Sequence, residues 1–503
     1  YQPFLYYKKM DSFVKIQSVQ GGEFTNSQNL VDFRIPPSGV YDLGASYINL
    51  NTNIDVVDSG TQGGEGIYDV GVEWITTDPE KPHFQNASVV KNVSMDCASK
   101  GRIENIRRVD RLRQNLATYV DSQKEQLNQS YIDINQLQQP INSQRYTQYA
   151  NFEKVGAIKS SYAVQTPISI KLSDLMEFCR TSEYDTNKAG ETRIHLELNR
   201  DRLEAVNRMK NADVPADFKN FKNISGAGND GNSITLGSNA GADTLVINDL
   251  SQVPYYVGQR LKVFATGNGG AGSSTGGDFL VSDITWDRGS GAYTITFNTR
   301  WGAPLTGAQT YSNIRVEIAE PTSIALKIQN AELVLKRVDN PQGLDEINYN
   351  TYSTEEINGN GAKNYQQLFT IEPEASNVVL MFPDGADGLI SKNNEIVQWR
   401  LRLNNNDLTD RDVEKESPLA YDRLALTLNS MGYSLRNLNR NSGNTLAGGW
   451  GDTYTDAKFN SQLIMNPLFQ TDRTKLLQVN ITATGGGIAN VNLFKQLPRV
   501  FSY

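Results

Sequence analysis

The residues best placed for a specific task in this chain are four arginines that crowd one short segment. They are Arg107, Arg108, Arg111 and Arg113, and the same segment contains Asp110. A basic helix face of this kind can contact nucleic-acid phosphates or bridge to a neighbouring protein. The alternative is a solvated face, or use within an oligomer, where neighbouring acids soften the charge. We predict assembly contacts at these arginines and leave the alternatives open.

A second candidate cluster mixes acids with arginines. Asp407, Asp410 and Asp412 are interspersed with Arg402 and Arg411. The pattern indicates a surface ion network on a loop at a subunit contact, so Asp410, Arg411 and Asp412 are also predicted assembly contacts. Glycosidase chemistry would require two carboxyl groups held across a cleft, and pairs of acids in sequence do not predict that. We predict no catalytic residue.

Histidines and cysteines are too few and too far apart for a predicted zinc site. His83 and His195 are the only histidines, and Cys97 and Cys179 the only cysteines. His195 lies in an alternating strand pattern, on the face opposite its apolar neighbours, which favours a partly exposed strand histidine over a general base. The two cysteines are expected to be free thiols from a reducing compartment.

The remaining motifs have structural explanations. The segment 266–277 is rich in glycine but lacks the Gly-Lys-Ser/Thr ending of a phosphate loop, and no helix pattern follows it. Asp384 and Asp387 lack the spacing of a calcium-binding loop. Four tryptophans are candidates for stacking on a sugar and equally for core anchors: Trp286, Trp301, Trp399 and Trp450. No metal, cofactor or cofactor-binding residue is predicted.

The elements that would position these residues are mostly β-strands, because apolar and polar residues alternate over many short runs. The runs occur in both halves of the chain and predict a β-sandwich twice: 166–175, 192–198, 323–335, 476–484 and 488–494. One segment differs. From Ile103 to Tyr119 apolar residues recur every three or four positions, which predicts an amphipathic helix extending to about Gln129.

The amino-acid composition limits the classes of protein to which this chain can belong. The chain has 503 residues, 38% of them hydrophobic, and a net charge of −8. An acidic chain is not expected to attract nucleic acid over its whole surface. The longest apolar runs are far shorter than the ~20 residues of a membrane helix, and no secretory signal is visible.

The domain organisation follows from shifts in composition. We expect an N-terminal arm over 1–20 and a first sandwich over 21–338. Within it, short strands between Gly-rich loops predict an inserted β-subdomain at about 207–321. The polar, turn-rich segment 339–365 is expected to be a linker, followed by a second sandwich over 366–503.

Three segments resemble double jelly-roll viral major capsid proteins, with those of virophages and polinton-like viruses as the nearest kin. Trp399–Leu424 is similar to a second-barrel segment, Ile168–Leu198 to late strands of the first barrel, and Ser88–Leu116 to a strand and a helix-bearing loop. The resemblance implies an all-β fold of two consecutive eight-stranded jelly rolls, with a β-rich insertion and a short helix in an inter-strand loop.

It also implies a non-enzymatic homotrimer that tiles an icosahedral shell around a DNA genome. Such a protein would be made inside the host cell and reside in the virion. Its partners would be copies of itself and penton and minor capsid proteins, without sequence-specific nucleic-acid binding. Two alternatives remain open: a secreted carbohydrate-binding or glycoside-acting β-sandwich protein, and a membrane-coating assembly scaffold of the same fold.

Overall fold

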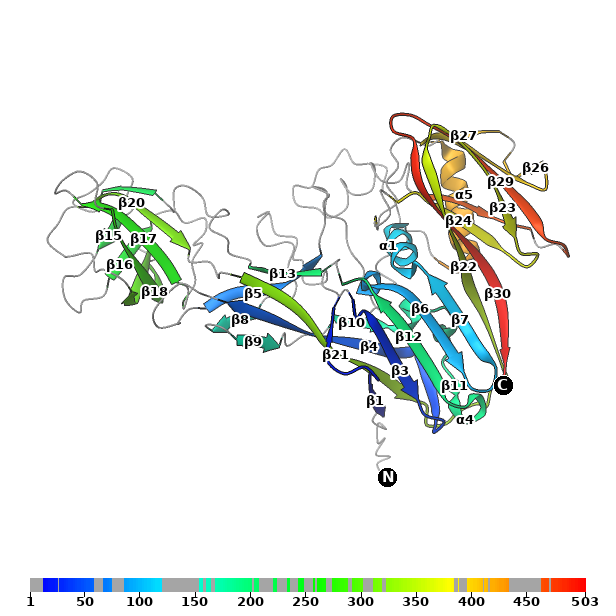
Figure 1. The fold of residues 1–503 in the computed structure, drawn as a ribbon, viewed down its shortest axis with the longest axis horizontal. Helices are drawn as coiled ribbons and strands as arrows, with labels where there is room; N and C mark the ends of the chain where they lie inside the picture. Colours follow the sequence, from blue (N-terminus) through cyan, green and yellow to red (C-terminus); the bar gives the residue numbers. More distant parts are fainter. Residues whose placement is uncertain are drawn as a thin grey trace, which may run out of the picture.

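The fold is described from a computed structural model and consists mainly of antiparallel β-sheets (Figure 1). The structure describes residues 12–25, 27–57, 67–74, 86–119, 153–156, 160–163, 168–200, 203–207, 220–223, 233–235, 243–247, 257, 260–267, 274–287, 292–301, 311–318, 323–383, 388, 396–409, 411–414, 417–433, 463–469 and 472–503.

Two sheets form the first sandwich. In spatial order, one sheet contains β1 (Phe13–Gln17), β21 (Ser323–Arg337), β4 (Val40–Val57) and β10 (Ile168–Lys171). β2 (Glu23–Phe24) also pairs with β21, while β9 (Ser160–Ala163) and β11 (Tyr184–Asp185) pair with β4. The facing sheet contains β3 (Leu30–Ile35), β12 (Thr192–Leu198), β6 (Val90–Cys97) and β7 (Gly101–Arg107).

The second sandwich is built in the same way. Its first sheet has the order β22 (Glu346–Ala362), β30 (Ile488–Ser502), β24 (Asn377–Met381) and β28 (Leu463–Pro467). Its facing sheet has the order β23 (Asn364–Ile371), β29 (Lys475–Ala483), β25 (Ile396–Leu403) and β26 (Asn406–Asp407), with β27 (Val413–Glu414) also paired to β25.

Strand order identifies both sandwiches as jelly rolls. When the eight principal strands of each sandwich are numbered along the chain, one sheet has the order 1-8-3-6 and the other 2-7-4-5, in both halves. Jelly rolls are double sheets of eight strands wound in this way. The predicted all-β fold with two consecutive jelly rolls is therefore confirmed.

The other strands belong to long connections of the first jelly roll. β5 (Ile67–Trp74), β8 (Glu153–Gly156) and β13 (Leu203–Asn207) form a three-stranded sheet. Between β12 and β21 the chain builds a separate sheet in the order β14 (Asn220–Asn223), β20 (Tyr311–Ile318), β17 (Arg260–Gly267), β18 (Ser274–Asp287), β19 (Ala292–Trp301), β16 (Asp243–Ile247) and β15 (Ser233–Thr235). Figure 1 shows this sheet projecting away from both jelly rolls.

Two longer helices occupy equivalent places. α1 (Val109–Tyr119) lies between the fifth and sixth principal strands of the first jelly roll, and α5 (Pro418–Ser430) between those of the second. Ser417 caps α5 by accepting a hydrogen bond from Ala420 N–H, and Pro418 occupies the first turn. The short helices are η1 (Asn86–Val89), α3 (Leu172–Leu175), η2 (Phe178–Arg180) and α4 (Thr186–Ala189).

Several predicted boundaries are wrong. Ile103 and Ile106 lie on strand β7, because the turn at 98–100 and Gly101, with φ of 75°, fold the chain into a hairpin with β6. The helix therefore starts at Val109, and residues beyond Tyr119 lie outside the described part. The strand predicted over 166–175 ends at Lys171, where α3 begins. Residues 13–17 form β1 rather than an arm.

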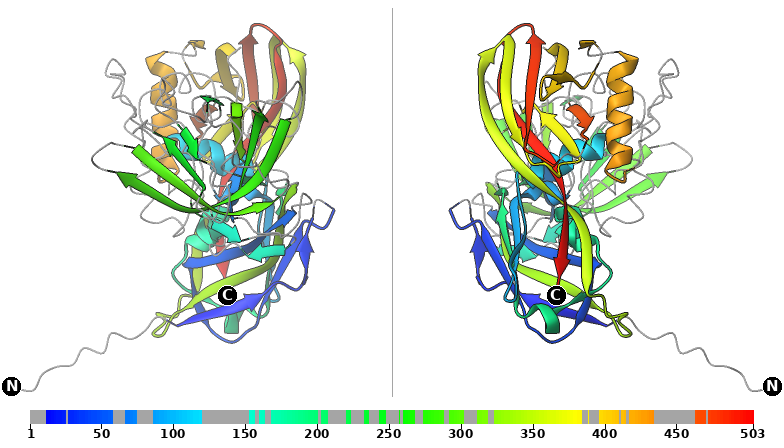
Figure 2. Two further views of the ribbon diagram at one scale, coloured as in Figure 1. Left: turned by 90° about the vertical axis from the view of Figure 1, so that its left-hand side faces the viewer. Right: turned by 90° about the vertical axis from the view of Figure 1, so that its right-hand side faces the viewer.

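The predicted linker 339–365 is also wrong, because β22 covers most of it. The sequence of β22 is polar because few of its side chains enter a core. Its backbone nevertheless pairs along β30. β22 and β30 are long enough to run beyond their own jelly roll and alongside the first (Figure 2). There Phe501 lies edge-on to Phe178, with ring centroids 5.5 Å apart, and Tyr503 accepts a hydrogen bond from Asp185 N–H at 2.8 Å.

We predict that Phe501→Ala will loosen the attachment of the two jelly rolls. Phe501 is 6% exposed, and truncation of a buried phenylalanine costs about 3–5 kcal/mol. Limited proteolysis and chemical denaturation should both report the loss. The matched control is Val500→Ala, at a neighbouring residue that is 59% exposed. Equal effects of the two changes would contradict the proposed docking role of this aromatic contact.

Candidate functional site between the two jelly rolls

The site of interest is the inter-sandwich seam, which we define as β7, α1 and η2 of the first jelly roll facing β22, β30 and the end of α5 in the second. Val109, Leu112 and Leu116 form the buried apolar side of α1. The first hydrophobic core extends across the seam, since it includes Leu428 of α5 and Phe494 of β30. Apolar packing thus brings the charged side of α1 against the second jelly roll.

The start of α1 is fixed by Arg108, which has a positive φ of 55° where β7 ends. Its backbone N–H donates to Asn92 Oδ1 at 2.9 Å. Its guanidinium lies 3.1 Å from Asp110 Oδ2, and both side chains are buried, at 5% and 0% exposed. This pair therefore compensates two charges inside the seam.

Arg111 reaches directly into the second jelly roll. It is 2% exposed, and its Nη1 donates to Asn492 Oδ1 of β30 at 2.6 Å. Its Nε donates to the carbonyl oxygen of Gly388 at 2.8 Å, and Glu356 of β22 lies 3.5 Å away. Both the charge and the fork-shaped donor of Arg111 are therefore used within the chain.

Arg113 lies at the centre of a buried network that joins three separate segments. Its Nη2 pairs with Glu177 Oε1 at 2.9 Å, and its Nη1 donates to Tyr433 Oη at 2.8 Å. Arg180 pairs with the other oxygen of Glu177 at 2.8 Å and also donates to Tyr433 Oη, at 2.7 Å. Burial by itself would lower the pKa of Arg113, but Tyr433 and Glu177 outweigh it and raise that pKa well above its ordinary value.

The alternative of a solvated face is wrong for Arg108, Arg111 and Arg113, which are all buried. Arg111 and Arg113 contact the second jelly roll, whereas Arg108 pairs with Asp110 of the same helix. Assembly contacts at these three arginines stay a prediction. The helical repeat of apolar residues in the sequence identified a charged side of the helix. It could not identify the part of the chain that covers this side. Arg107 is exposed at the end of β7, and its carbonyl oxygen accepts a hydrogen bond from Thr354 Oγ1 at 3.0 Å. Its role in assembly stays a prediction.

One pair of the predicted ion network, Arg402 with Asp407, is present on β25 and β26, and Arg400, which was not predicted, joins it. Arg400 and Arg402 both donate to Asp407, at 2.9 and 2.7 Å, and these bonds lower the pKa of Asp407 to about 2. Asp412 lies 3.6 Å from Arg400, Arg411 is exposed, and Asp410 lies outside the described residues. Whether Arg411 and Asp412 contact another subunit stays a prediction.

Glu104 is a seam residue that sequence reasoning missed. The pairing of β6 with β7 shifts register between Met95 and Asp96, and this bulge leaves Ile103 and Glu104 both buried. Glu104 Oε2 accepts a hydrogen bond from Phe178 N–H at 3.0 Å, and the side chain also interacts with Thr351 of β22. Burial raises the pKa of Glu104 to about 8, against the lowering effect of the Phe178 bond.

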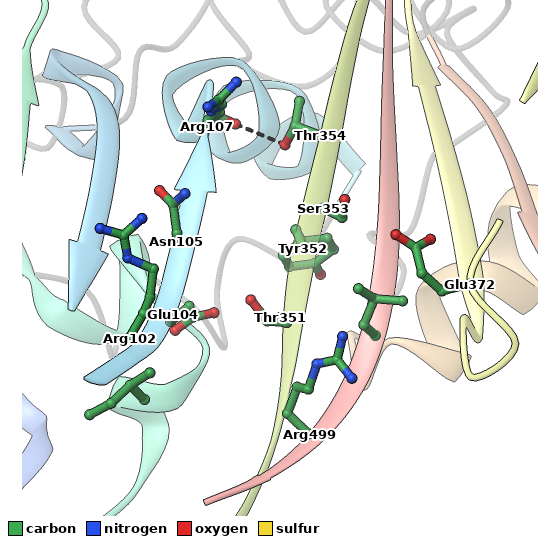
Figure 3. Close-up of a pocket in the computed structure, with 12 residues that line it drawn as sticks. Arg102, Glu104, Asn105, Arg107, Thr351, Tyr352, Ser353, Thr354, Glu372 and Arg499 are labelled. Carbon is green, nitrogen blue, oxygen red and sulfur yellow. Dashed lines mark hydrogen bonds between the residues drawn. The ribbon is translucent and has the colours of Figure 1, made fainter. Parts of the chain in front are cut away.

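A groove of about 380 Å³ opens beside Glu104. Figure 3 shows the carboxyl group of Glu104 pointing from β7 toward Thr351 of β22. The groove is lined by Arg102, Ile103, Glu104, Asn105, Arg107, Thr351, Tyr352, Ser353, Thr354, Glu372, Leu497 and Arg499. The sequence contained one signal that could have predicted this groove. It is the inward-facing glutamate in the run Ile103-Glu104-Asn105-Ile106.

The other predicted residues occupy scattered positions. His195 has an intermediate exposure on β12, with Nδ1 2.5 Å from Asp32 and Nε2 3.5 Å from Asp96. Cys97 and Cys179 are buried free thiols, and burial raises the pKa of Cys179 well above its ordinary value. Trp399 packs in the second core.

Residues 266 and 274 pair across the hairpin of β17 and β18, so part of the glycine-rich segment belongs to strands. Trp286 and Trp301 lie on β18 and β19. His83, Asp384, Asp387 and Trp450 lie outside the described residues. Among the residues described, no three acids, histidines or cysteines are grouped to hold a metal ion, and no helix is long and apolar enough to cross a membrane.

We predict that Arg113→Ala will destabilise the chain by about 3–5 kcal/mol, because it leaves the buried Glu177 carboxylate with one cation fewer. Chemical denaturation measures the change. Arg107→Ala is the matched control, since this exposed arginine has no ion pair among the described residues and should shift stability by no more than about 0.5 kcal/mol. Similar losses in both variants would contradict the role assigned to Arg113.

We predict that Glu104→Gln will flatten the pH dependence of stability. The unfolded chain loses the Glu104 proton near the ordinary pKa of 4.5, whereas the folded chain keeps it to about pH 8. Stability should therefore fall as pH rises through this window, and the variant should escape that fall. Thermal unfolding between pH 4 and pH 9 tests this, with the exposed Glu346→Gln as control. Parallel profiles for Glu104→Gln and the parent protein would contradict it.

Comparison with known proteins gives likenesses of fold. No protein-family model matches the chain, and no curated protein matches it in sequence. Among solved structures, the mavirus major capsid protein is 11% identical, with 99% of this chain and 92% of that chain covered at a TM-score of 0.34. The major capsid protein of STIV, Sulfolobus turreted icosahedral virus, is 6% identical, with 97% and 96% covered at a TM-score of 0.33.

A match of another kind is a protein solved in complex with neoagarooctaose, which is 10% identical, with 53% of this chain and 33% of that chain covered at a TM-score of 0.16. At these values the fold assignment rests on strand order, which is the same in both halves of the chain. The chain is a double jelly-roll protein.

Proposed function

We propose that this protein is a viral major capsid protein that assembles as a homotrimer and tiles an icosahedral shell. The observation that carries the proposal is the repetition of one eight-stranded block, with the same strand order in each copy, inside one chain. A trimer of such chains contains six similar blocks around a threefold axis. Identical subunits then pack almost as hexagons, which is the geometry that a closed shell of many copies needs.

Rigid attachment of the two blocks supports the proposal. The Arg113 network, the Arg111 contacts and the Phe501 aromatic contacts all lie within one chain and join the two jelly rolls. A tile must keep a fixed angle between its halves, because small errors accumulate over a shell. The same contacts would have no evident use in a protein whose domains act separately.

The small number of open sheet edges in a jelly roll also supports a role in assembly. A jelly roll leaves few open sheet edges, which limits uncontrolled strand pairing at the high local concentration of a growing shell. Permanent interfaces between tiles would bury on the order of 2,000–5,000 Å² each. Arg107, Arg411 and Asp412 are proposed contacts at such interfaces.

The remaining parts of the proposal concern setting and partners. The shell would enclose a DNA genome, and the protein would be made inside the host cell and reside in the virion. Penton and minor capsid proteins are the expected partners besides other copies of the chain. The sheet built by β14–β20 projects from the first jelly roll (Figure 1) and would form a protrusion on the tile.

We predict that the purified protein will have three times the monomer mass of 55.9 kDa at micromolar concentration. Analytical ultracentrifugation measures this, and negative-stain electron microscopy should show triangular or pseudo-hexagonal particles. A stable monomer would argue against the capsid tile and favour a carbohydrate-binding or glycoside-acting sandwich protein. Trimers that form lattices but are missing from purified virions would identify an assembly scaffold instead.

A further inference from the structure

The second jelly roll has an open sheet edge at a place where the first jelly roll covers the edge with its own chain. The equivalent edge strands are β3 and β23, the second principal strand of each block. Along β3, Val19 N–H donates to Asp32 O at 2.8 Å, and Asp32 N–H donates to Gln20 Oε1 at 2.8 Å. Along β23, only β29 is paired through the backbone among the described residues. The difference follows from the connections, because residues 18–29 link β1 to β3, whereas Lys363 alone links β22 to β23.

Three residues of β23 turn their backbone groups toward this open edge. Leu476 of β29 lies opposite Thr370 but uses both of its backbone groups on the side of β25. Its N–H donates to Asn404 Oδ1 at 2.8 Å, and its oxygen accepts from Asn404 N–H at 2.9 Å. Thr370 therefore points its N–H and C=O away from β29, and because pairing alternates along a strand, Leu368 and Gln366 do the same. The side chains of these three residues are exposed.

β23 lacks the features with which proteins protect an exposed edge. Such edges are commonly short, bulged, or interrupted by charged residues and proline. The eight residues of β23, NYQQLFTI, contain no charge and no proline, and their pairing with β29 has no register shift. Gln367 Nε2 donates to Leu368 O at 3.4 Å, and Lys495 Nζ donates to Thr370 O at 3.3 Å. Each of these oxygens keeps a second lone pair, so the edge can still accept another strand.

Two exposed leucines lie beside the open edge. Leu368 is 55% exposed, and Leu476 is 46% exposed. They are diagonal neighbours on the outer face of the sheet, because Leu368 lies opposite Gln478 and Leu476 lies opposite Thr370. Exposed apolar side chains next to unpaired backbone groups indicate a surface that a partner strand would cover.

We propose that β23 pairs antiparallel with β23 of a second copy of the chain across a twofold axis, so that the sheet continues from one copy into the other. In the proposed register Leu368 lies opposite Leu368 of the second copy, and Gln366 lies opposite Thr370. This register places exposed side chains on one face and brings the outward backbone groups of both strands together. Leu368 and Leu476 of both copies then lie on one face of a continuous sheet.

Charge complementarity favours a second copy as the occupant of this edge. Lys495 pairs with both Glu355 and Glu372, at 2.7 and 3.0 Å, so that these two carboxylates share one cation. Lys363, directly before β23, is exposed and has no ion pair among the described residues. In the proposed register Lys363 lies opposite Pro373 of the second copy, next to Glu372. Each copy would thus bring a second cation to the acids of the other.

The size of the edge indicates a weak contact. One pair of eight-residue strands is at the low end of specific interfaces, below about 1,200 Å². Weak contacts suit junctions between larger units, where many of them act together. In a shell the contact would join neighbouring trimers, and only this last step rests on the proposed function.

Disulfide cross-linking of full-length variants with one added cysteine tests the pairing. In Leu368→Cys the two new side chains would face each other with Cα atoms about 5.5 Å apart, a distance that a disulfide can span. Gln366→Cys is the matched control on the same face, because its two copies would lie more than about 13 Å apart. With oxidised glutathione, we expect about tenfold more covalent dimer from Leu368→Cys on a non-reducing denaturing gel. Mixing Gln366→Cys with Thr370→Cys should produce the dimer, and the parent protein should not, since Cys97 and Cys179 are buried.

Charged variants test the same register without oxidation. Leu368→Lys and Leu368→Glu each place like charges opposite each other, so each should weaken association beyond the basic oligomer by about tenfold in sedimentation velocity. An equimolar mixture of the two should recover this association, because opposite charges then meet. Leu426→Lys, at a residue of α5 that is 53% exposed, is the control and should associate as the parent does.

Three results would overturn the proposal: no covalent dimer from Leu368→Cys, equal amounts from Leu368→Cys and Gln366→Cys, or no recovery when the lysine and glutamate variants are mixed. An edge that binds a different protein instead would give the first of these results. Circular dichroism shows whether each variant is folded. A trimer without cross-links argues against this pairing alone, whereas cross-linked dimers of a protein that forms no trimer argue against the capsid tile alone.

Discussion

The interaction on which the arrangement of this protein depends is the buried network of Arg113, Glu177, Arg180 and Tyr433. Taking a guanidinium and a carboxylate out of water is costly, and the cost is offset only when each is met by its partner in good geometry. Here the three charged groups all belong to the first jelly roll, and the second contributes Tyr433, whose hydroxyl group accepts hydrogen bonds from both arginines. The two jelly rolls meet in this network through the hydrogen bonds to Tyr433.

Apolar packing and this network act together at the seam. The first core does not stop at the surface of the first jelly roll but continues to Leu424 and Leu428 of α5, to Met431 directly after it, and to Phe494 of β30. The sheet that contains β30 is thereby covered on both faces, by its own core on one side and by helices on the other. The two jelly rolls thus share a core, although each has the strand order of a complete fold.

Where this shared core ends, the edge strands β7 and β22 meet without completing a ladder, and their backbone groups are bridged by Tyr349 and Thr354. An unpaired edge inside a molecule leaves polar space, and the groove beside Glu104 occupies that space. The buried glutamate and the groove therefore have the same origin as the rigid attachment, since both follow from how two closed sheets are placed side by side.

The sequence by itself determined the class of fold and most strands. Alternation marked β12 at its observed bounds, as well as the cores of β21, β29 and β30, because a strand with one buried face repeats every two residues. It missed α5, although Ser417 and Pro418 are a cap and a first-turn residue. It missed β22, whose pattern is weak because few of its side chains are buried.

Only the tertiary structure decided whether the arginines and Glu104 are buried and which residues they contact. The period of α1 separates its faces, but Tyr433 lies 320 residues from Arg113 in sequence and meets it only after both jelly rolls have formed. Glu104 is buried through a bulge and through a second edge strand that approaches from far along the chain. Burial and charge compensation are properties of the packed chain, so a local pattern cannot reveal them.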